Sequence, residues 1–399
     1  MPETPPPHRW LTRTVLAIGL SSLFSDMGHE MATAAMPALL VSLGGTSATL
    51  GLVEGVADGV AVFAKLASGH WSDRVARRKP VAIVGYALTA LGIGSFALAT
   101  RRTDVFVGRA AAWLGRGVKS PVRKVLLAEA TTPETYGRAF GLDRAMDSAG
   151  AVVGPLVALL TLGILGTRGL FALTLVPSVL AVLAVAILVQ EKPHTPAPKR
   201  RLLEGLSSLP RPFRLFLLGV GVAGLADFSR TLLSLWAAQA LAPTYGAARA
   251  GALSMGLYVG YNVVYTASCA WSGTLADRFP KGSVLAFGYA LACIPAALLL
   301  VPGAGLVTYA FVFATSGLYM GFWETVESAA AASYLPKEVR GVGFGAMDGV
   351  NGLSDVASSV VVGVLWMVSP TAAMSFVVGT SLLGAFLVWT AGRAAVTAS

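Results

Sequence analysis

Long apolar stretches alternate with short polar ones along nearly the whole chain of 399 residues. Each is about 20 residues long, enough for one helix to cross the ~30 Å hydrocarbon core of a membrane. The runs are continuous, whereas a membrane β-barrel shows alternating segments of about ten residues. The pattern therefore predicts an all-α membrane protein with twelve transmembrane helices. These helices are expected at residues 13–40, 49–70, 80–100, 105–130, 138–163, 169–190, 213–241, 248–272, 283–302, 305–333, 342–366 and 370–393.

The longest polar stretch, EKPHTPAPKRRLLEGLSSLPRP, separates the sixth predicted helix from the seventh. Its prolines oppose a continuous helix. We therefore predict two six-helix bundles, at residues 13–190 and 213–399, joined by a cytoplasmic linker at residues 191–212. The proline-rich residues 1–12 are expected to form a disordered N-terminal tail.

An internal repeat supports this division into two bundles. SGHWSDRVARRK begins at Ser68 and SGTLADRFPKG begins at Ser272, and their aspartates are 277 − 73 = 204 residues apart. The same shift aligns PETYGRAFG with KEVRGVGFG. Because six crossings return the chain to its starting side, the second copy enters the membrane in the same orientation. This is the parallel pseudo-two-fold repeat of one class of transporter, whose binding site lies between the halves near the midplane.

Composition and charge agree with membrane insertion. Hydrophobic residues make up 55% of the chain and charged residues 13%, whereas a soluble domain has about 25% charged residues. The net charge is +10, but the excess Lys and Arg lie mainly in loops on one side of the predicted bundle, so nucleic acid binding is not its explanation. Because basic loops remain in the cytoplasm, we predict a multi-pass protein of the bacterial inner (plasma) membrane with both termini cytoplasmic.

Charged residues inside the predicted helices are the candidate functional groups. Each costs roughly 2.5–3.5 kcal/mol at the centre of a membrane helix, so such residues must face one another or a wet cavity. Arg109, Arg116 and Arg123 recur every seven residues on the fourth predicted helix, which places them on one face. Lys119 lies on the same side, and we expect Arg116 and Lys119 near mid-depth.

The first predicted helix contains SSLFSDMGHEMATAAMP, with two acids and an imidazole in an apolar run. Asp26 and Glu30 are four residues apart on one face and can neutralise Arg116 or Lys119 at comparable depth. Three interpretations of Asp26, His29 and Glu30 remain open. They form a structural ion pair with the fourth helix, they serve proton coupling or substrate gating, or they bind a transition metal, for which Asp, His and Glu are plausible ligands.

The repeat places charges of opposite sign at equivalent positions in the two halves. Glu327 aligns with Arg123 (327 − 123 = 204), and Arg230 aligns with Asp26 (230 − 26 = 204). We therefore expect a cavity with a basic N-terminal wall and an acidic C-terminal wall, suited to an anionic or zwitterionic solute plus protons. The candidate substrate-binding residues are Arg116, Lys119, His29, Asp58, Asp227, Arg230, Tyr258, Tyr261, Asn262, Trp323, Glu327 and Asn351.

Proton coupling requires a buried carboxyl group whose pKa responds to an approaching cation. The candidates are Asp26, Glu30, Glu324 and Asp355, and Asp26 or Glu30 also has Arg116 as its expected neighbour. Protonation of the acid would free the arginine for an anionic substrate, and this competition is expected to give exchange. The sequence contains no Gly-x-x-x-x-Gly-Lys-Ser/Thr run for ATP. We therefore expect a proton gradient to supply the energy, and we expect no cofactor.

The chain resembles the major facilitator superfamily over essentially its whole length. GHWSDRVARRK is similar to the superfamily's cytoplasmic signature Gly-x-x-x-Asp-Arg-x-Gly-Arg-Arg, with Ala76 where a glycine is usual. The fifth predicted helix resembles the exporter signature, a glycine followed after eight residues by Gly-x-x-x-Gly-Pro. The matching residues are Gly141, Gly150, Gly154 and Pro155, while Ala158 and Leu159 replace the two closing glycines.

The resemblance implies alternating access by rocking of the two bundles. It also implies that Asp73 accepts hydrogen bonds from amides at the start of the eleventh helix, near Gly341, where an anion is favoured by roughly 0.3–1 kcal/mol. The arginines beside Asp73 are expected to pair with acids of the opposite half, so that this latch favours the outward-open state. The candidate gating residues are Gly69, Asp73, Arg74, Arg77, Arg78, Asp143, Asp147, Gly150, Gly154, Pro155, Asp277 and Arg278.

The leading functional prediction is a proton-coupled exporter, an antiporter, of a small solute with organic anions among the candidates; it is not an enzyme. The alternatives are divalent-metal efflux through Asp26, His29 and Glu30, uptake of an organic anion by symport, and a membrane receptor or scaffold that transports nothing. The expected partners are a small-molecule substrate and the lipid bilayer, without nucleic acid, and the protein is expected to be a monomer.

Overall fold

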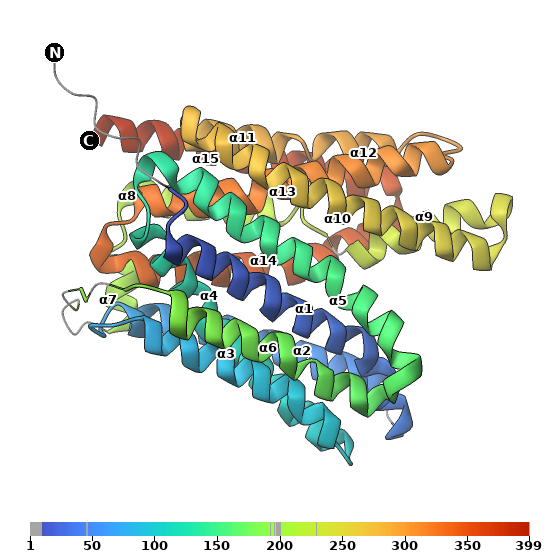
Figure 1. Ribbon diagram of the computed structural model, residues 1–399. Coiled ribbons are helices and arrows are strands. Elements are labelled where there is room, and N and C mark those ends of the chain that lie inside the picture. Colours follow the sequence, from blue (N-terminus) through green and yellow to red (C-terminus); the bar gives the residue numbers. More distant parts are fainter. Residues whose placement is uncertain are drawn as a thin grey trace.

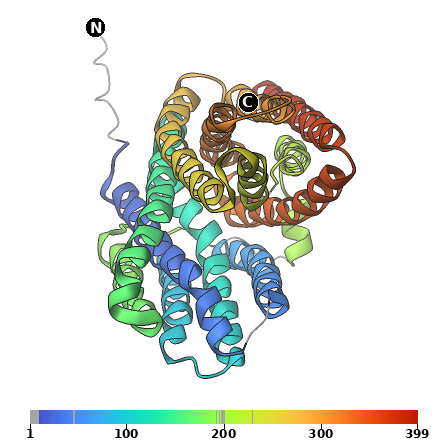
Figure 2. The ribbon, with the colours of Figure 1, turned by 90° about the vertical axis from the view of Figure 1, so that its right-hand side faces the viewer.

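The computed structural model describes residues 10–44, 47–191, 193–194, 196, 201–228 and 230–398. Every regular element in these ranges is helical, and the helices form two bundles that lie side by side (Figures 1 and 2). The predicted tail at residues 1–12 and the predicted linker at residues 191–212 lie partly outside the described residues. Within the linker, α7 (Leu202–Ser207) forms a short helix against α2 and α14.

The N-terminal half follows the predicted spans closely. The predicted break between the fifth and sixth helices falls at Gly166, whose φ of 65° interrupts α5 and lies in the left-handed region that favours glycine. The sixth span ends in a π-helical turn. The elements are α1 (Arg13–Ser42), α2 (Ser47–Ser72), α3 (Lys79–Gly94), η1 (Ser95–Leu98), α4 (Arg102–Glu129), η2 (Pro133–Thr135), α5 (Tyr136–Leu173), α6 (Leu175–Leu183) and η3 (Ala184–Leu188).

The C-terminal half departs from the prediction at two spans, because residues 213–241 and 283–302 each form two helices instead of one. At the first break the amides of Ala226 and Asp227 bond to carbonyls three residues back, at 2.8 and 3.0 Å, so the chain tightens and leaves the α-helix. The elements are α8 (Arg211–Gly224), α9 (Arg230–Tyr245), α10 (Ala247–Arg278), α11 (Lys281–Ala290), α12 (Cys293–Leu299), α13 (Leu306–Tyr334), η4 (Lys337–Val339), α14 (Arg340–Val368) and α15 (Pro370–Ala398).

Glycines let the helices within each half approach closely. On α3, Gly85 and Gly92 face Gly115 and Gly108 of α4, and a Cβ at Gly85 would lie 2.9 Å from the carbonyl oxygen of Gly115. Both pairs are spaced by seven residues, so one stripe of each helix forms the contact. Larger side chains here would push α4 away from α3 and move the cations that α4 carries.

The two halves touch mainly through α2 against α14 and α5 against α10. At the end of the molecule where α1 begins and α15 ends, Gly69 meets Gly341 and Gly137 meets Gly273, too closely for any side chain. We call this the closed end. Toward the opposite end, the open end, the two bundles diverge (Figure 1). There, a Cβ at Gly59 or Gly256 would have no atom of another helix within 4 Å.

Six helical stretches of the described chain are long and apolar enough by themselves to cross a membrane. The helices α1 and α4 are outside this group, and they carry interior charges such as Asp26 and Arg116. Their polar residues face the space between the halves, which explains why length and hydropathy alone understate the number of spans. The six stretches are Lys79–Leu98, Pro133–Leu188, Lys281–Leu299, Leu306–Tyr334, Lys337–Val368 and Pro370–Ala394.

Candidate substrate and coupling site

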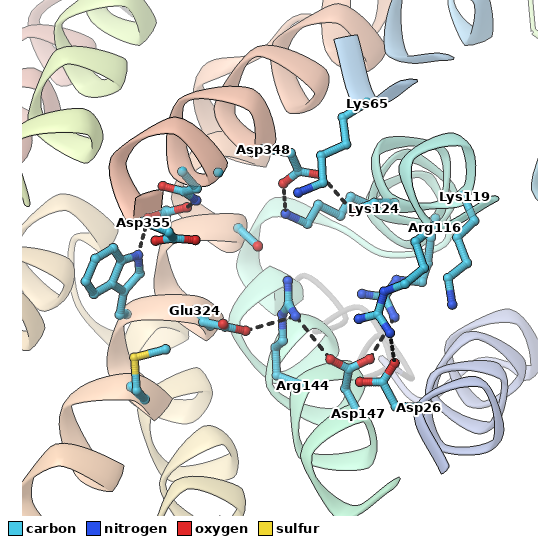
Figure 3. A pocket seen from close by; sticks show the side chains of 18 of the residues that line it. Asp26, Lys65, Arg116, Lys119, Lys124, Arg144, Asp147, Glu324, Asp348 and Asp355 are labelled. Atoms are coloured by element: carbon cyan, nitrogen blue, oxygen red, sulfur yellow. Dashed lines mark hydrogen bonds and ion pairs between the residues drawn. The ribbon is translucent and has the colours of Figure 1, made fainter. Parts of the chain in front are cut away.

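A cavity of about 340 Å³ lies between the two halves (Figure 3). Its six cationic side chains all come from α2, α4 and α5 of the N-terminal half, and five of its seven acidic side chains come from the C-terminal half. This arrangement matches the expected basic and acidic walls. The lining residues are Asp26, Lys65, Arg116, Lys119, Ser120, Arg123, Lys124, Arg144, Asp147, Asp227, Met320, Trp323, Glu324, Glu327, Ser328, Asp348, Asn351, Gly352 and Asp355.

Asp26 and Arg116 form an ion pair across α1 and α4, with 3.2 Å between Oδ1 and Nη1. The Asp26 side chain is 10% exposed and that of Arg116 is 31% exposed, so the arginine is the more accessible partner. Lys119, one turn further on, is buried, contacts the hydroxyl of Ser25 and lies 4.4 Å from the ring centre of Tyr86. The expected pairing between the first and fourth helices is therefore present.

His29 and Glu30 do not line the cavity. His29 packs against Trp113 with 4.5 Å between ring centres and the rings tilted by 41°, and its Nε2 is 3.9 Å from the Glu30 carboxylate. Arg109 binds Glu54 and not Glu30, at 2.8 Å. Asp58 accepts a hydrogen bond from the Trp113 indole at 2.6 Å and is likewise absent from the lining. Because α1 turns Asp26 and Glu30 toward different neighbours, their four-residue spacing does not make them a pair.

No group of three or more His, Cys, Asp or Glu side chains in the described part of the chain is placed to hold a metal ion. Asp26 is engaged with Arg116, while His29 contacts Trp113 and Glu30. The arrangement of these residues gives the metal-site interpretation no support.

An ion-pair network near Asp26 connects α4, α5 and α13. Arg123 binds Asp143 at 3.5 Å and Asp147 at 3.2 Å, so both acids expected to gate the protein hold an arginine of their own half. Arg144 bridges Asp147 at 3.2 Å and Glu324 of the C-terminal half at 2.9 Å. The contact between the halves is thus made by Arg144, which the sequence analysis did not select.

A second contact between the halves joins α4 to α14. Asp348 accepts a hydrogen bond from Ser120 at 2.7 Å and forms an ion pair with Lys124. The repeat relates this contact to the first, since 348 − 144 = 204 and 324 − 120 = 204. Lys124 and Asp348 were also missing from the sequence-based set, and the offset applied to every intramembrane charge would have indicated them.

The signature loops close the molecule at the closed end. Asp73 accepts hydrogen bonds from the amides of Gly341 and Val342, both at 2.8 Å, as expected. Asp277 does the same for Gly137 and Arg138 of the other half, at 2.7 and 3.1 Å. Each loop therefore caps a helix of the opposite half.

The environment of Asp73 is electrostatically mixed. Burial raises the pKa of the Asp73 carboxyl to about 6, although the two amide donors and Arg78 act to lower it. Arg78 binds Asp73 and Glu129, both of its own half, so the expectation that the loop arginines pair with acids of the opposite half is wrong for Arg78. Its guanidinium lies between two acids that follow α2 and end α4.

Several other predicted residues have local roles. Gly150 and Gly154 fit against carbonyls of α1, at 2.4 and 2.6 Å from a Cβ position, so they position α5 within its own half. Tyr258 and Asn262 bond within α10 and do not line the cavity. Among the described residues, no ion pair is found for Arg74, Arg77 or Arg278, and Pro155 lies within α5.

The C-terminal wall holds its acids in two ways. Glu327 is buried and accepts hydrogen bonds from three neutral donors, Tyr289, Trp323 and Asn351, at 2.9, 2.6 and 2.6 Å. The break after α8 brings Asp227 to Arg230 at 3.1 Å, and Arg230 also donates to Tyr261 at 3.2 Å. Asp355 is exposed in the cavity wall and makes no hydrogen bond or ion pair with another described residue.

Two helical halves that share a polar cavity, closed at one end and open at the other, define a membrane transporter of the alternating-access class. The sequence agrees, because the model of the Major Facilitator Superfamily matches residues 18–359. The chain therefore belongs to the major facilitator superfamily, whose members are membrane-embedded transporters rather than enzymes.

Relatives and solved structures support this assignment. An uncharacterized MFS-type transporter of Methanocaldococcus jannaschii is 27% identical over 94% of this chain and 93% of its own length. The multidrug resistance protein MdtH of Photorhabdus laumondii is 36% identical over only 27% of each chain. The human organic anion transporter MFSD10 (TETRAN) has a TM-score of 0.74 at 16% identity, with 96% of this chain and 100% of that one covered. The fucose:proton symporter FucP of E. coli has a TM-score of 0.72 at 17% identity, with 96% and 99% covered.

Proposed function

We propose that this protein is a proton-coupled secondary transporter of a small charged solute and that the solute binds in the central cavity. The observation that carries the proposal is the Asp26–Arg116 ion pair in the cavity wall, at 3.2 Å. A carboxylate and a guanidinium that neutralise each other can separate when a proton takes the carboxylate and a substrate anion takes the guanidinium. Binding of the substrate in the cavity and protonation of Asp26 would then be linked.

The direction of coupling depends on which group the substrate displaces. An anion that takes Arg116 leaves Asp26 without its cation, so Asp26 holds a proton more firmly and the two ligands bind together. This reverses the exchange that the sequence argument assigned to this pair. The pair favours co-transport, and uptake by symport of a solute with an anionic group is therefore our first candidate.

Export by proton exchange is the second candidate, and Asp355 favours it. Its carboxylate faces the cavity without a cation in contact, so a positively charged substrate group would compete there with a proton. The similar proteins include a multidrug resistance protein among the relatives and a proton symporter among the solved structures. We further propose that the closed end faces the cytoplasm, because the basic loops lie there.

Flux measurements in proteoliposomes test the proposal. A transport screen with an imposed pH gradient identifies a solute, and Arg116→Ala and Asp26→Asn are then compared with the unchanged protein. Arg116→Ala is expected to reduce uptake of that solute at least tenfold, because removing a hydrogen-bonded charge costs about 1.5–3 kcal/mol. Asp26→Asn is expected to retain solute exchange across the membrane while losing the response to the pH gradient.

The exposed Lys337 provides the matched control, since Lys337→Gln also removes one positive charge and Lys337 is not part of the cavity lining. Normal flux in Arg116→Ala, or an undiminished response to the pH gradient in Asp26→Asn, would contradict the proposal. The absence of gradient-driven flux for every solute would favour a receptor or scaffold instead.

A further inference from the structure

The charges of the cavity do not all cancel within it. Arg116 pairs with Asp26, and Lys124 pairs with Asp348. Arg123 pairs with Asp143 and Asp147, and Arg144 pairs with Glu324. After these pairs are formed, Lys65 and Lys119 remain on the N-terminal half, and neither contacts an acid among the described residues. The N-terminal wall therefore presents two cations that no acid contacts directly, although acids of the cavity attract both at longer range.

The C-terminal wall has the opposite excess. Asp355 lines the cavity without a hydrogen bond or ion pair to another described residue, and Arg230 and Lys65 attract it only at longer range. Glu327 accepts hydrogen bonds only from neutral donors. On α14, Asn351 and Asp355 are four residues apart and face the cavity together. Figure 3 shows Asp355 across the cavity from Arg116 and Lys119. Two opposite excesses thus face each other across one space.

The two oppositely charged walls disfavour binding of a ligand that carries only positive or only negative charge. A purely anionic solute at Lys119 would lie in the same cavity as Asp355 and Glu327, and a purely cationic solute at Asp355 would meet six cationic side chains. Like charges in a partly desolvated space repel strongly, which is how a binding site rejects the wrong ligand. A ligand that carries both charges satisfies both walls.

We infer that the substrate is a zwitterion, whose anionic group binds Lys119 and Arg116 on the N-terminal half and whose ammonium group binds Asp355 on the C-terminal half. The inference rests on the proposed function, since it assigns the substrate class of the same cavity. The volume of about 340 Å³ limits the ligand to a small molecule, at the lower end of the usual range of ligand pockets. A zwitterion that bridges both walls would also draw the two halves together.

The test uses sets of probes matched in length. Each set contains an ω-amino acid, the n-alkanoate and the n-alkylamine with the same number of carbons, from three to six carbons. Binding to the purified full-length protein is measured by calorimetry and by thermal stabilisation. For at least one chain length, the ω-amino acid is expected to bind about tenfold or more tightly than either matched probe.

Two variants resolve the two poles. Asp355→Asn is expected to remove the preference for the amino acid over the alkanoate, and Lys119→Gln to remove its preference over the alkylamine. Glu338→Gln is the control, because Glu338 is an exposed acid outside the cavity, and it is expected to leave both preferences unchanged. Circular dichroism and the unfolding temperature identify a variant that fails to fold, and Asp355→Glu is then used to check that an acid at this position restores the preference.

The inference is overturned if an alkanoate or an alkylamine binds as tightly as every ω-amino acid, or if no ω-amino acid binds at about 10 mM. It is also overturned if folded Asp355→Asn still binds the ω-amino acid more tightly than the alkanoate. The opposite charges of the two walls would then serve only to attract the halves to each other. Failure of the proposed function is distinguishable, because selective binding without gradient-driven flux would retain the zwitterion and reject the transport proposal. Gradient-driven flux restricted to anions would retain the transport proposal and reject the zwitterion.

Discussion

At the residue scale, most charged side chains in the interior of this protein form ion pairs. A buried ion pair gains little net stability, because desolvation offsets attraction, but removing one partner leaves an uncompensated charge that costs about 3–5 kcal/mol. Arg123 is held by two acids and Lys124 by one. Such fully paired residues are unsuited to bind a ligand, whereas the partly exposed Arg116 can change partners.

The capping aspartates provide a prediction at this scale. Asp73→Ala leaves the amides of Gly341 and Val342 without their acceptor, and each buried group that loses its partner costs about 1–3 kcal/mol. The closed end should therefore open more often. Cys269 is fully buried on α10, where α10 packs on α5 at Gly141, so we expect N-ethylmaleimide to label it at least about fivefold faster.

The labelling is followed by mass spectrometry in a Cys293→Ser background, and Asp277→Ala is expected to have a similar effect because it caps the equivalent helix. Glu338→Gln serves as the control, since Glu338 is exposed in η4. Equal labelling rates in the unchanged protein and in both alanine variants would show that the caps do not hold the closed end.

At the element scale, glycine decides how the halves meet. The glycines of α2 and α5 touch those of α14 and α10 in two sets related by the repeat: Gly69 with Gly341, and Gly273 with Gly137. Small residues let helix backbones approach within a membrane, where packing rather than the hydrophobic effect drives association. The conformation closed at this end therefore depends on the absence of side chains at these positions.

Gly137→Ala tests this dependence. Its Cβ would lie 2.0 Å from the carbonyl oxygen of Gly273, a backbone atom that cannot move without shifting α10. We expect the variant to fold but to populate the conformation closed at this end much less. If the closed conformation is destabilised by roughly 1.4 kcal/mol, Cys269 is labelled about tenfold faster.

Gly163→Ala is the matched control, because Gly163 also lies on α5 and its Cβ position has no atom of another helix within 4 Å. Its labelling rate should equal that of the unchanged protein. Slow labelling of folded Gly137→Ala would mean that α5 and α10 tolerate a wider separation without opening.

At the scale of the whole molecule, two charged contacts in the lining of the cavity hold the halves together. Arg144 with Glu324 and Asp348 with Ser120 and Lys124 are related by the same 204-residue repeat that relates the loops. Because these contacts cross between halves, rocking of one bundle against the other must break them. They are therefore expected to contribute to the balance between conformations.

A charge exchange tests this contribution. Arg144→Glu and Glu324→Arg are each expected to speed the labelling of Cys269, because each places like charges where an ion pair of 2.9 Å stood. The double variant restores opposite charges and should recover part of the original labelling rate. The expected coupling energy between the two positions is about 0.5–3 kcal/mol. Lys337→Glu reverses an exposed charge and should change nothing. Additive effects in the double variant would exclude a direct interaction.

Local pattern was sufficient to predict much of this fold. The continuous apolar runs indicated the spans, the 204-residue offset indicated two parallel halves, and the signature loop indicated the contact of Asp73 with Gly341. The two broken helices could not be predicted, because Gly224 and Asp227 are compatible with a helix in other surroundings. The partners of Glu30 and Arg109 were also beyond prediction, since spacing defines a face of one helix but not the neighbour that this face meets.

The amino-acid sequence by itself determined which segments cross the membrane, their repeat and the sign of charge on each half, because these follow from hydropathy and spacing along one chain. Only the tertiary structure decided which charges of the cavity form ion pairs and which do not. The rotation of each helix and the approach of the two halves set those pairs, and both depend on packing among residues far apart in the chain. The excess of cations at Lys119 and of acids at Asp355, from which a substrate class can be argued, is a product of that packing.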